Sequence, residues 1–189
     1  MQNSKLSKQK LLIFGLGNNG KEYQKTRHNF GHFVVAKLLE KDLFNNLVII
    51  KTNDRFMNDC GVSLKKLVDY YKIEPANVLV IHDDMDFEFG DVKLDYNRSS
   101  AGHHGVESVI KSLGTDKFIR VRLGIGPSTG SGLIRINEHH NIEEFVLESF
   151  LPNERSKVKH MTKTAVEAVN LLLEKGLEAM RETLAGKVP

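Results

Sequence analysis

The feature that most constrains the fold of this 189-residue chain is a repeated alternation of short apolar runs with stretches of helical periodicity. The apolar runs are rich in Leu, Val and Ile and are too short for helices, which is typical of buried strands. Between them, apolar residues recur every three or four positions, as on a helix with one buried face. This alternation predicts an α/β fold: a single domain over residues 1–189, with a mixed, mostly parallel twisted sheet and helices on both faces.

The same patterns predict where the elements lie. We expect helices in residues 28–41, 61–73 and 105–114, and a largely helical chain after residue 141. The run 119–126 alternates strictly, with Arg120 and Arg122 on the face opposite its aliphatic residues. Strands are expected at 10–17, 46–52, 77–86, 90–97 and 119–126.

Composition and the start of the chain narrow the class of protein. The single cysteine, Cys60, excludes an internal disulfide. A net charge of +3 is compatible with a polyanionic partner but is common among soluble enzymes. The apolar run after the lysine-rich start is too short to span a bilayer, so we expect no membrane association, a cytoplasmic location and a flexible tail at residues 1–9. An organelle-targeting segment is the alternative for this start.

The glycine-rich stretch GLGNNG (residues 15–20) has three interpretations. It matches the Gly-x-Gly-x-x-Gly pattern of dinucleotide-binding loops, but the residues KEYQKTRHN that follow are a poor helix start. It could be a plain turn, because asparagines tolerate unusual backbone angles. It could also present the side-chain amide of Asn18 to a substrate, as a donor that fixes a carbonyl or a water.

A histidine and an acidic run are candidates for acid–base chemistry. His28 precedes an apolar helix, and histidine is the usual general base near neutral pH when a carboxylate orients it. The run HDDMD (residues 82–86) supplies carboxylates at the end of a buried strand. A surface histidine and a solvated acidic loop are the plain alternatives. A divalent ion held by His82 and these acids is another, but the spacing does not match a calcium loop. The adjacent His103 and His104 lack a zinc spacing, and their loop could bind an anion through backbone amides.

Six stretches, in this order, resemble the bacterial-type peptidyl-tRNA hydrolase family: GLGNNGKEYQKTRHNFG, RFMNDCG, VIHDDMDFEFGDVKL, GHHGVESVIKSLG, FIRVRLGIG and FVLESF. They extend across most of the chain, to about residue 150. The resemblance implies a single α/β domain that hydrolyses the ester joining a peptide to the 3′ end of tRNA. It also implies peptidyl-tRNA as the partner, a monomer, and no metal or organic cofactor.

The resemblance also implies roles for particular residues. His28 matches the catalytic base and Asp83 the acid that orients it. Asn18 and Asn58 match amides that hold the peptide and stabilise developing negative charge. The remaining matches are the substrate cleft at Tyr23, Phe56, Met57, His103 and His104, and the tRNA phosphate contacts at Lys93, Arg122 and Arg98.

The chain departs from the family pattern in four places. Asn19 stands where proline is usual, and His104 where asparagine is usual. Asp95 replaces a lysine, which weakens the phosphate site unless Arg98 substitutes for it. The segment between His28 and Asn58 is shorter than usual.

These departures keep two competing hypotheses in view. A non-catalytic RNA-binding relative is the runner-up, although retention of the four polar residues given above as base, orienting acid and amides speaks against it. A nucleotide-dependent oxidoreductase would need a helix directly after residue 20, and the sequence there opposes one.

Overall fold

The computed structural model describes residues 10–40, 48–127 and 141–185, and within them a five-stranded sheet of order β2-β1-β3-β5-β4. β1 pairs in parallel with β2 and β3, β3 pairs in parallel with β5, and β4 is antiparallel to β5. The predicted mixed, mostly parallel sheet is therefore confirmed. The strands are β1 (Leu11–Gly15), β2 (Val48–Thr52), β3 (Val78–Glu88), β4 (Val92–Tyr96) and β5 (Ile119–Gly126).

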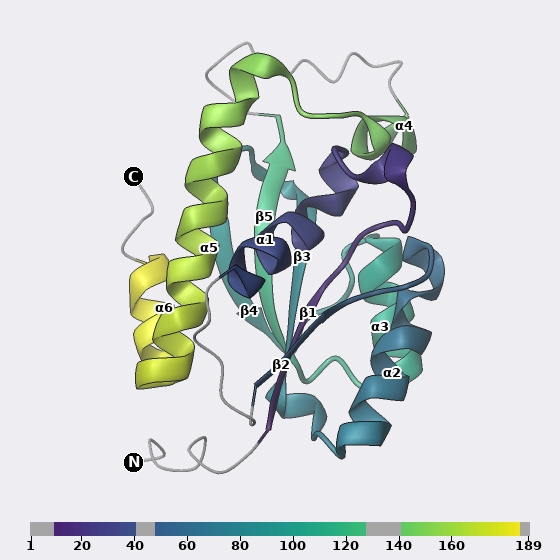
Figure 1. Ribbon diagram of the computed structural model, residues 1–189, viewed down its shortest axis with the longest axis vertical. Coiled ribbons are helices and arrows are strands. Elements are labelled where there is room, and N and C mark those ends of the chain that lie inside the picture. Colours follow the sequence, from purple (N-terminus) through teal and green to yellow (C-terminus); the bar gives the residue numbers. More distant parts are fainter. Residues whose placement is uncertain (1–9, 41–47, 128–140, 186–189) are drawn as a thin grey trace.

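Helices cover both faces of the sheet, as predicted (Figure 1). One face carries α1 (Phe30–Leu39), α5 (Arg155–Lys175) and α6 (Leu177–Ala185), and the other carries α2 (Cys60–Tyr71) and α3 (His104–Leu113). A short helix, α4 (Ile142–Leu147), lies at the end of the sheet where the polar residues gather. Five short 3-10 helices complete the described elements: η2 (Lys21–Tyr23), η3 (Arg27–Asn29), η4 (Met57–Asp59), η5 (Pro75–Asn77) and η6 (Pro152–Glu154).

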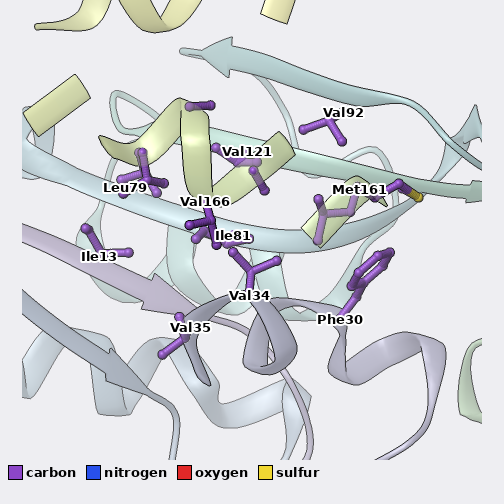
Figure 2. Close-up of a cluster of buried hydrophobic side chains, with 14 of the residues drawn as sticks. Ile13, Phe30, Val34, Val35, Leu79, Ile81, Val92, Val121, Met161 and Val166 are labelled. Carbon is purple, nitrogen blue, oxygen red and sulfur yellow. The ribbon is translucent and has the colours of Figure 1, made fainter. Parts of the chain in front are cut away.

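Two hydrophobic clusters fill the layers between sheet and helices. Figure 2 shows the cluster under α1 and α5, where Leu79 and Ile81 of β3 meet Val34 of α1 and Val166 of α5. The second cluster includes Leu64 of α2 and other apolar side chains of α2, α3 and the sheet. Burial on both faces explains why the strands read as nearly continuous apolar runs.

The boundaries that differ from the sequence prediction include those of β3 and of the C-terminal helical stretch. β3 continues to Glu88, beyond the expected end at 86, because Glu88 still pairs with Gly126 of β5 after a register shift between Asp84 and Glu88. The C-terminal helical stretch is divided into α4, η6, α5 and α6; Gly176, at φ 89°, separates α5 from α6. The tail expected at residues 1–9 lies outside the described residues. In the described part of the chain, no helix has the length and apolarity needed to cross a membrane.

A tight contact at the start of α1 positions the site. A Cβ on Gly31 would lie 2.2 Å from the carbonyl oxygen of Ile81 in β3, so only glycine lets the helix start approach the strand this closely. Gly15 of β1 contacts the same part of α1: a Cβ on Gly15 would lie 2.5 Å from the carbonyl oxygen of Gly31. Close packing here places η3, just before α1, beside the middle of β3.

Candidate active site

Three side chains from distant parts of the chain meet at Asp83, in the middle of β3 and just beyond the end of the neighbouring β1. His28 of η3 places Nδ1 3.1 and 3.0 Å from the two carboxylate oxygens of Asp83. His103, at the start of α3, places Nε2 3.1 Å from Asp83 Oδ1. The Asp83 side chain is only 2% exposed, whereas the His28 side chain is 12% exposed. The structure thus brings together His28, Asp83 and His103, all three of which the sequence singled out.

Hydrogen bonds at His103 determine which of its nitrogens carries the proton. Its Nδ1 accepts from the backbone amides of Gly105 at 3.1 Å and Val106 at 3.3 Å, so it caps α3. A neutral His103 must then carry its proton on Nε2 and donate it to Asp83. Ligand atoms of the three groups lie within 4.8 Å of one another, close enough for a metal ion. Metal ligation through Nε2 would put the proton on Nδ1 and remove the helix cap, so these residues fit a hydrogen-bonded cluster better than a metal site.

The charges of the cluster stabilise one another. Burial lowers the pKa of His28, but the charge and the hydrogen bond of Asp83 raise it by more, so it lies above the ordinary 6.5. Burial raises the pKa of Asp83, while His28 and His103 together lower it well below its ordinary range. Asp83 therefore remains a carboxylate, and His28 takes up a proton more readily than an isolated histidine does.

His82 lies behind this cluster and supports its backbone. The ring is completely buried, and Nδ1 donates to the carbonyl oxygen of Asp83 at 2.6 Å. Burial lowers the pKa of His82 far below its ordinary value, so the ring is neutral. The geometry does not favour a divalent ion held by His82 and the acidic run, because Asp84 and Asp86 face Arg122, at 2.6 and 3.8 Å.

Asn18 is fixed with one amide group left to donate. Its Oδ1 accepts from the backbone amide of Met57 at 2.8 Å. Its backbone N–H donates to Asn29 Oδ1 at 2.7 Å, and its carbonyl accepts from Asn29 Nδ2 at 2.9 Å. Among the described residues nothing bonds to the Asn18 Nδ2 group, so this N–H donor is available to a ligand.

Asn53 is a structural residue that the sequence patterns did not reveal. It clamps Gly17 by accepting from its amide at 3.0 Å and donating to its carbonyl at 2.5 Å, and it also contacts His32 Nε2 at 3.0 Å. The glycine stretch is therefore held as a turn, followed only by the short helix η2. The dinucleotide interpretation is wrong for this loop. A signal was present, because Asn53 directly follows a predicted strand at the same sheet edge.

The other predicted cleft residues differ in accessibility. Tyr23 and Phe56 meet edge to face with ring centroids 6.0 Å apart, and Phe56 is 59% exposed. Asn58 is also exposed. Met57 is buried, and a Cβ on Gly105 would lie 2.3 Å from its sulfur, so it packs under the start of α3.

His104 is exposed on the first turn of α3. Its ring nitrogens lie 3.9 Å from Glu107 Oε2 and 3.9 Å from Glu143 Oε1. Glu143 belongs to α4, so His104 points between α3 and α4 and away from Asp83. It stands at the rim of the site.

Arg122 does not fit the phosphate-binding role that the resemblance implied. Its side chain is 5% exposed, its Nε lies 2.6 Å from Asp84 Oδ2, and its Nη1 bonds to Asp95. Two carboxylates neutralise the buried guanidinium, and Asp95 is one of the departures from the family pattern. Lys93 and Arg98 remain accessible to solvent. The Nζ of Lys93 lies 3.6 Å from Asp91, and the side chain of Arg98 is 60% exposed.

Arg27, next to His28, ties the site to a distant segment and was missed by sequence reasoning. Its Nη2 bonds to both oxygens of Glu154 at 3.1 and 3.0 Å, and its Nη1 donates to the carbonyl of Ser149 at 3.1 Å. The guanidinium also lies 4.4 Å from the centre of the Phe145 ring. No local pattern predicts a pair 127 residues apart in the sequence.

Replacing Arg27 with methionine is expected to lower the free energy of unfolding by about 3–5 kcal/mol, because Glu154 would be left buried and unpaired. Chemical unfolding followed by circular dichroism measures this. Lys21→Met, at an exposed position on the same segment, is the control and should be nearly neutral. Equal stability of the two variants would contradict the structural role given to Arg27.

Comparison with known proteins agrees with this arrangement over nearly the whole chain. The sequence profile of the family described as peptidyl-tRNA hydrolase matches residues 12–188. The peptidyl-tRNA hydrolase of Mycobacterium tuberculosis H37Rv is 39% identical, covering 89% of this chain and 93% of the relative. That of Bifidobacterium longum DJO10A is 34% identical, covering 93% and 97%. The crystal structure of peptidyl-tRNA hydrolase from Acinetobacter baumannii has a TM-score of 0.76 at 27% identity, covering 93% of this chain and 94% of its own. This chain belongs to the peptidyl-tRNA hydrolase family.

Proposed function

We propose that this chain hydrolyses the ester bond between the peptide and the tRNA of peptidyl-tRNA, releasing free tRNA and a peptide. The observation that carries the proposal is the Asp83 carboxylate held between His28 and His103, with the His28 side chain still partly exposed to solvent. An ester is reactive enough that one activated water suffices, so the mechanism needs no covalent intermediate. We expect the chain to act as a monomer in the cytoplasm, as its resemblance to the family implies.

The proposed first step is general base catalysis by His28. Its Nδ1–H donates to Asp83, which leaves Nε2 unprotonated and able to accept a proton from water. The water oxygen then attacks the ester carbonyl carbon, and the carbonyl π electrons move onto its oxygen. Asp83 stabilises the imidazolium that forms, as the raised pKa of His28 reflects.

The second step breaks the ester bond. The tetrahedral intermediate re-forms the carbonyl and expels the ribose oxygen of the tRNA, which takes the proton from His28 Nε2. The Asn18 Nδ2 group, and Asn58 when substrate is bound, donate hydrogen bonds to the negatively charged oxygen. One such donor is worth roughly 2.7–4 kcal/mol in comparable acyl-transfer sites.

The neighbouring side chains suit the end of a tRNA. The exposed face of Phe56, braced by Tyr23, can stack on the terminal base. His103 closes the inner side of the cleft, and Met57 supports its floor from beneath. His104 at the rim can exchange hydrogen bonds with the substrate through either ring nitrogen.

Lys93 and Arg98 are proposed to contact tRNA phosphates, whereas Arg122 is committed to Asp84 and Asp95. In the double variant Lys93→Ala, Arg98→Ala, the slope of log Kd against log salt should therefore be smaller by about 2, roughly 1 for each lost phosphate contact. Filter binding of tRNA over a salt series measures the slope. Lys66→Ala, Lys72→Ala, which removes two exposed cations of α2 and of the residue that follows it, should leave it unchanged. An unchanged slope in the first variant would place the phosphate contacts elsewhere.

The activity itself is tested with an N-blocked aminoacyl-tRNA, by following release of the blocked amino acid and recovery of free tRNA. The proposal expects release far above the spontaneous rate. Tight tRNA binding with release no faster than in buffer would instead favour the non-catalytic RNA-binding relative. Neither binding nor release would refute both functions.

A further inference from the structure

A hollow away from the proposed active site lies between α1 and α5. These two helices lie side by side on one face of the sheet (Figure 1). This α1–α5 groove has a volume of about 1080 Å³ and shares no residue with the His28–Asp83–His103 cluster. Its lining comes from α1, from the first three turns of α5, and from Lys25, Ser149 and Phe150 at one end. The proposed hydrolysis makes no use of it.

The floor of the groove is apolar and rigid. Phe33, Val158 and Val166 contribute to it with Phe150, and all four also pack against the hydrophobic core. The ring of Phe150 lies 5.1 Å from Phe30 and 6.2 Å from Phe33, centre to centre. An apolar hollow of this kind, rimmed by charged side chains, is typical of a protein-binding surface.

The rim has an uneven charge. Lys37 pairs with Glu40 at 2.8 Å, and Lys163 with Glu167 at 3.7 Å. The other three cations of the lining have no described carboxylate as an ion-pair partner. They gather at the end where α5 begins, and the positive end of its helix dipole adds to them. These three are Lys25, Arg155 and Lys159.

We propose that the α1–α5 groove binds an amphipathic helix of a partner protein, with its apolar side on the floor and acidic side chains in its last turn. The acids would meet Lys25, Arg155 and Lys159 near the start of α5. The last turn of the partner helix would therefore lie beside the first turn of α5, so the two helices would run antiparallel and their dipoles would attract each other. The stretch of α5 from Arg155 to Glu167 is about 18 Å long at 1.5 Å per residue, which accommodates roughly three helical turns. Anchors at spacings of three and four residues would fill the floor.

The chemistry of the groove favours a helix over RNA. Single-stranded RNA binds through aromatic faces on which bases stack. The rings of Phe33 and Phe150 are instead packed against each other and against Phe30. The surface fits acidic, apolar side chains better than a nucleotide chain.

Two labelled synthetic helices of about 16 residues test the proposal. Both carry leucines at helical spacing; one has glutamates in its last turn and the other has lysines there. Binding is measured by fluorescence anisotropy to the wild-type chain, to Arg155→Glu, Lys159→Glu, and to the control Lys111→Glu, Lys117→Glu, which has the same net charge as the first variant. We expect the acidic helix to bind wild type and control alike, and the first variant about tenfold more weakly. The lysine helix should prefer the first variant.

A steric variant makes the test independent of charge. Ala36 lines the groove from the exposed side of α1, and Ala36→Gln should weaken binding of the acidic helix without affecting folding or peptide release. No binding to wild type, or equal binding by all four proteins, would overturn the proposal. A single-stranded oligonucleotide that displaces the helix and itself loses affinity in Arg155→Glu, Lys159→Glu would assign the groove to RNA and also overturn it. Because the readout is binding, failure here leaves the proposed hydrolysis untouched.

Discussion

His28→Ala is expected to release peptide from N-blocked aminoacyl-tRNA two to four orders of magnitude more slowly than wild type, as about 10²–10⁴-fold is typical of a lost general base. Without the imidazole, water has no acceptor for its proton when it attacks the carbonyl. Single-turnover release at saturating enzyme separates this step from substrate binding. Because His28 is not proposed to hold the tRNA, the affinity for tRNA should change little.

The control for this experiment is His160→Ala, which removes an exposed histidine of α5. It should release peptide at the wild-type rate. If His28→Ala retained most of the activity, another group would have to serve as the base. If it lost tRNA binding along with activity, the side chain would be a substrate contact.

Asp83→Asn should cost a comparable amount, about 10⁴-fold by analogy with the asparagine variant of a serine-protease triad. Asp83 accepts hydrogen bonds from both His28 and His103, but an asparagine offers one oxygen and one NH₂ group. His103 is fixed as a donor because its other nitrogen caps α3. The asparagine NH₂ group would then face His28 Nδ1 and force the proton onto Nε2, where a base needs a lone pair.

The matched control is Asp86→Asn, three residues further along β3 and largely exposed. It should have little effect on release. A rescue of Asp83→Asn by a second change, His103→Ala, would support the tautomer argument, because the asparagine oxygen could then turn to His28. Full activity of Asp83→Asn alone would contradict the role of the carboxylate.

Much of the fold was predictable because strand and helix periodicities are local properties of the sequence. β5 shows which properties of a strand cannot be predicted from local periodicity. Its alternation was predicted correctly, but not the burial of Arg120 and Arg122. That burial depends on contacts with the Ser99 carbonyl and the Phe87 ring and on acids from other strands. Pairing with β5 likewise extended β3 beyond the point where its apolar residues end.

The site was predictable to a similar degree. Polar residues that follow strands gather at one sheet edge, which explains why Asn18, His28 and Asp83 could be singled out. The groups that hold them could not, because Arg27 pairs with Glu154 and Asn53 clamps Gly17 only after distant segments meet. The commitment of Arg122 to Asp95 was hidden for the same reason, since the two lie on neighbouring strands 27 residues apart.

The most direct test of the central claim compares two pKa values in the wild-type chain. One is the pKa of His28 from NMR titration, and the other is the pKa of the acidic limb in kcat/KM for peptide release. The base must be unprotonated to act, so the rate should rise with pH and level off above the pKa of His28. The account predicts that both values coincide and lie above the ordinary 6.5, because Asp83 stabilises the protonated ring. A kinetic pKa that differs from the pKa of His28 measured by NMR, or that lies below 6.5, would contradict the assignment of His28 as the base.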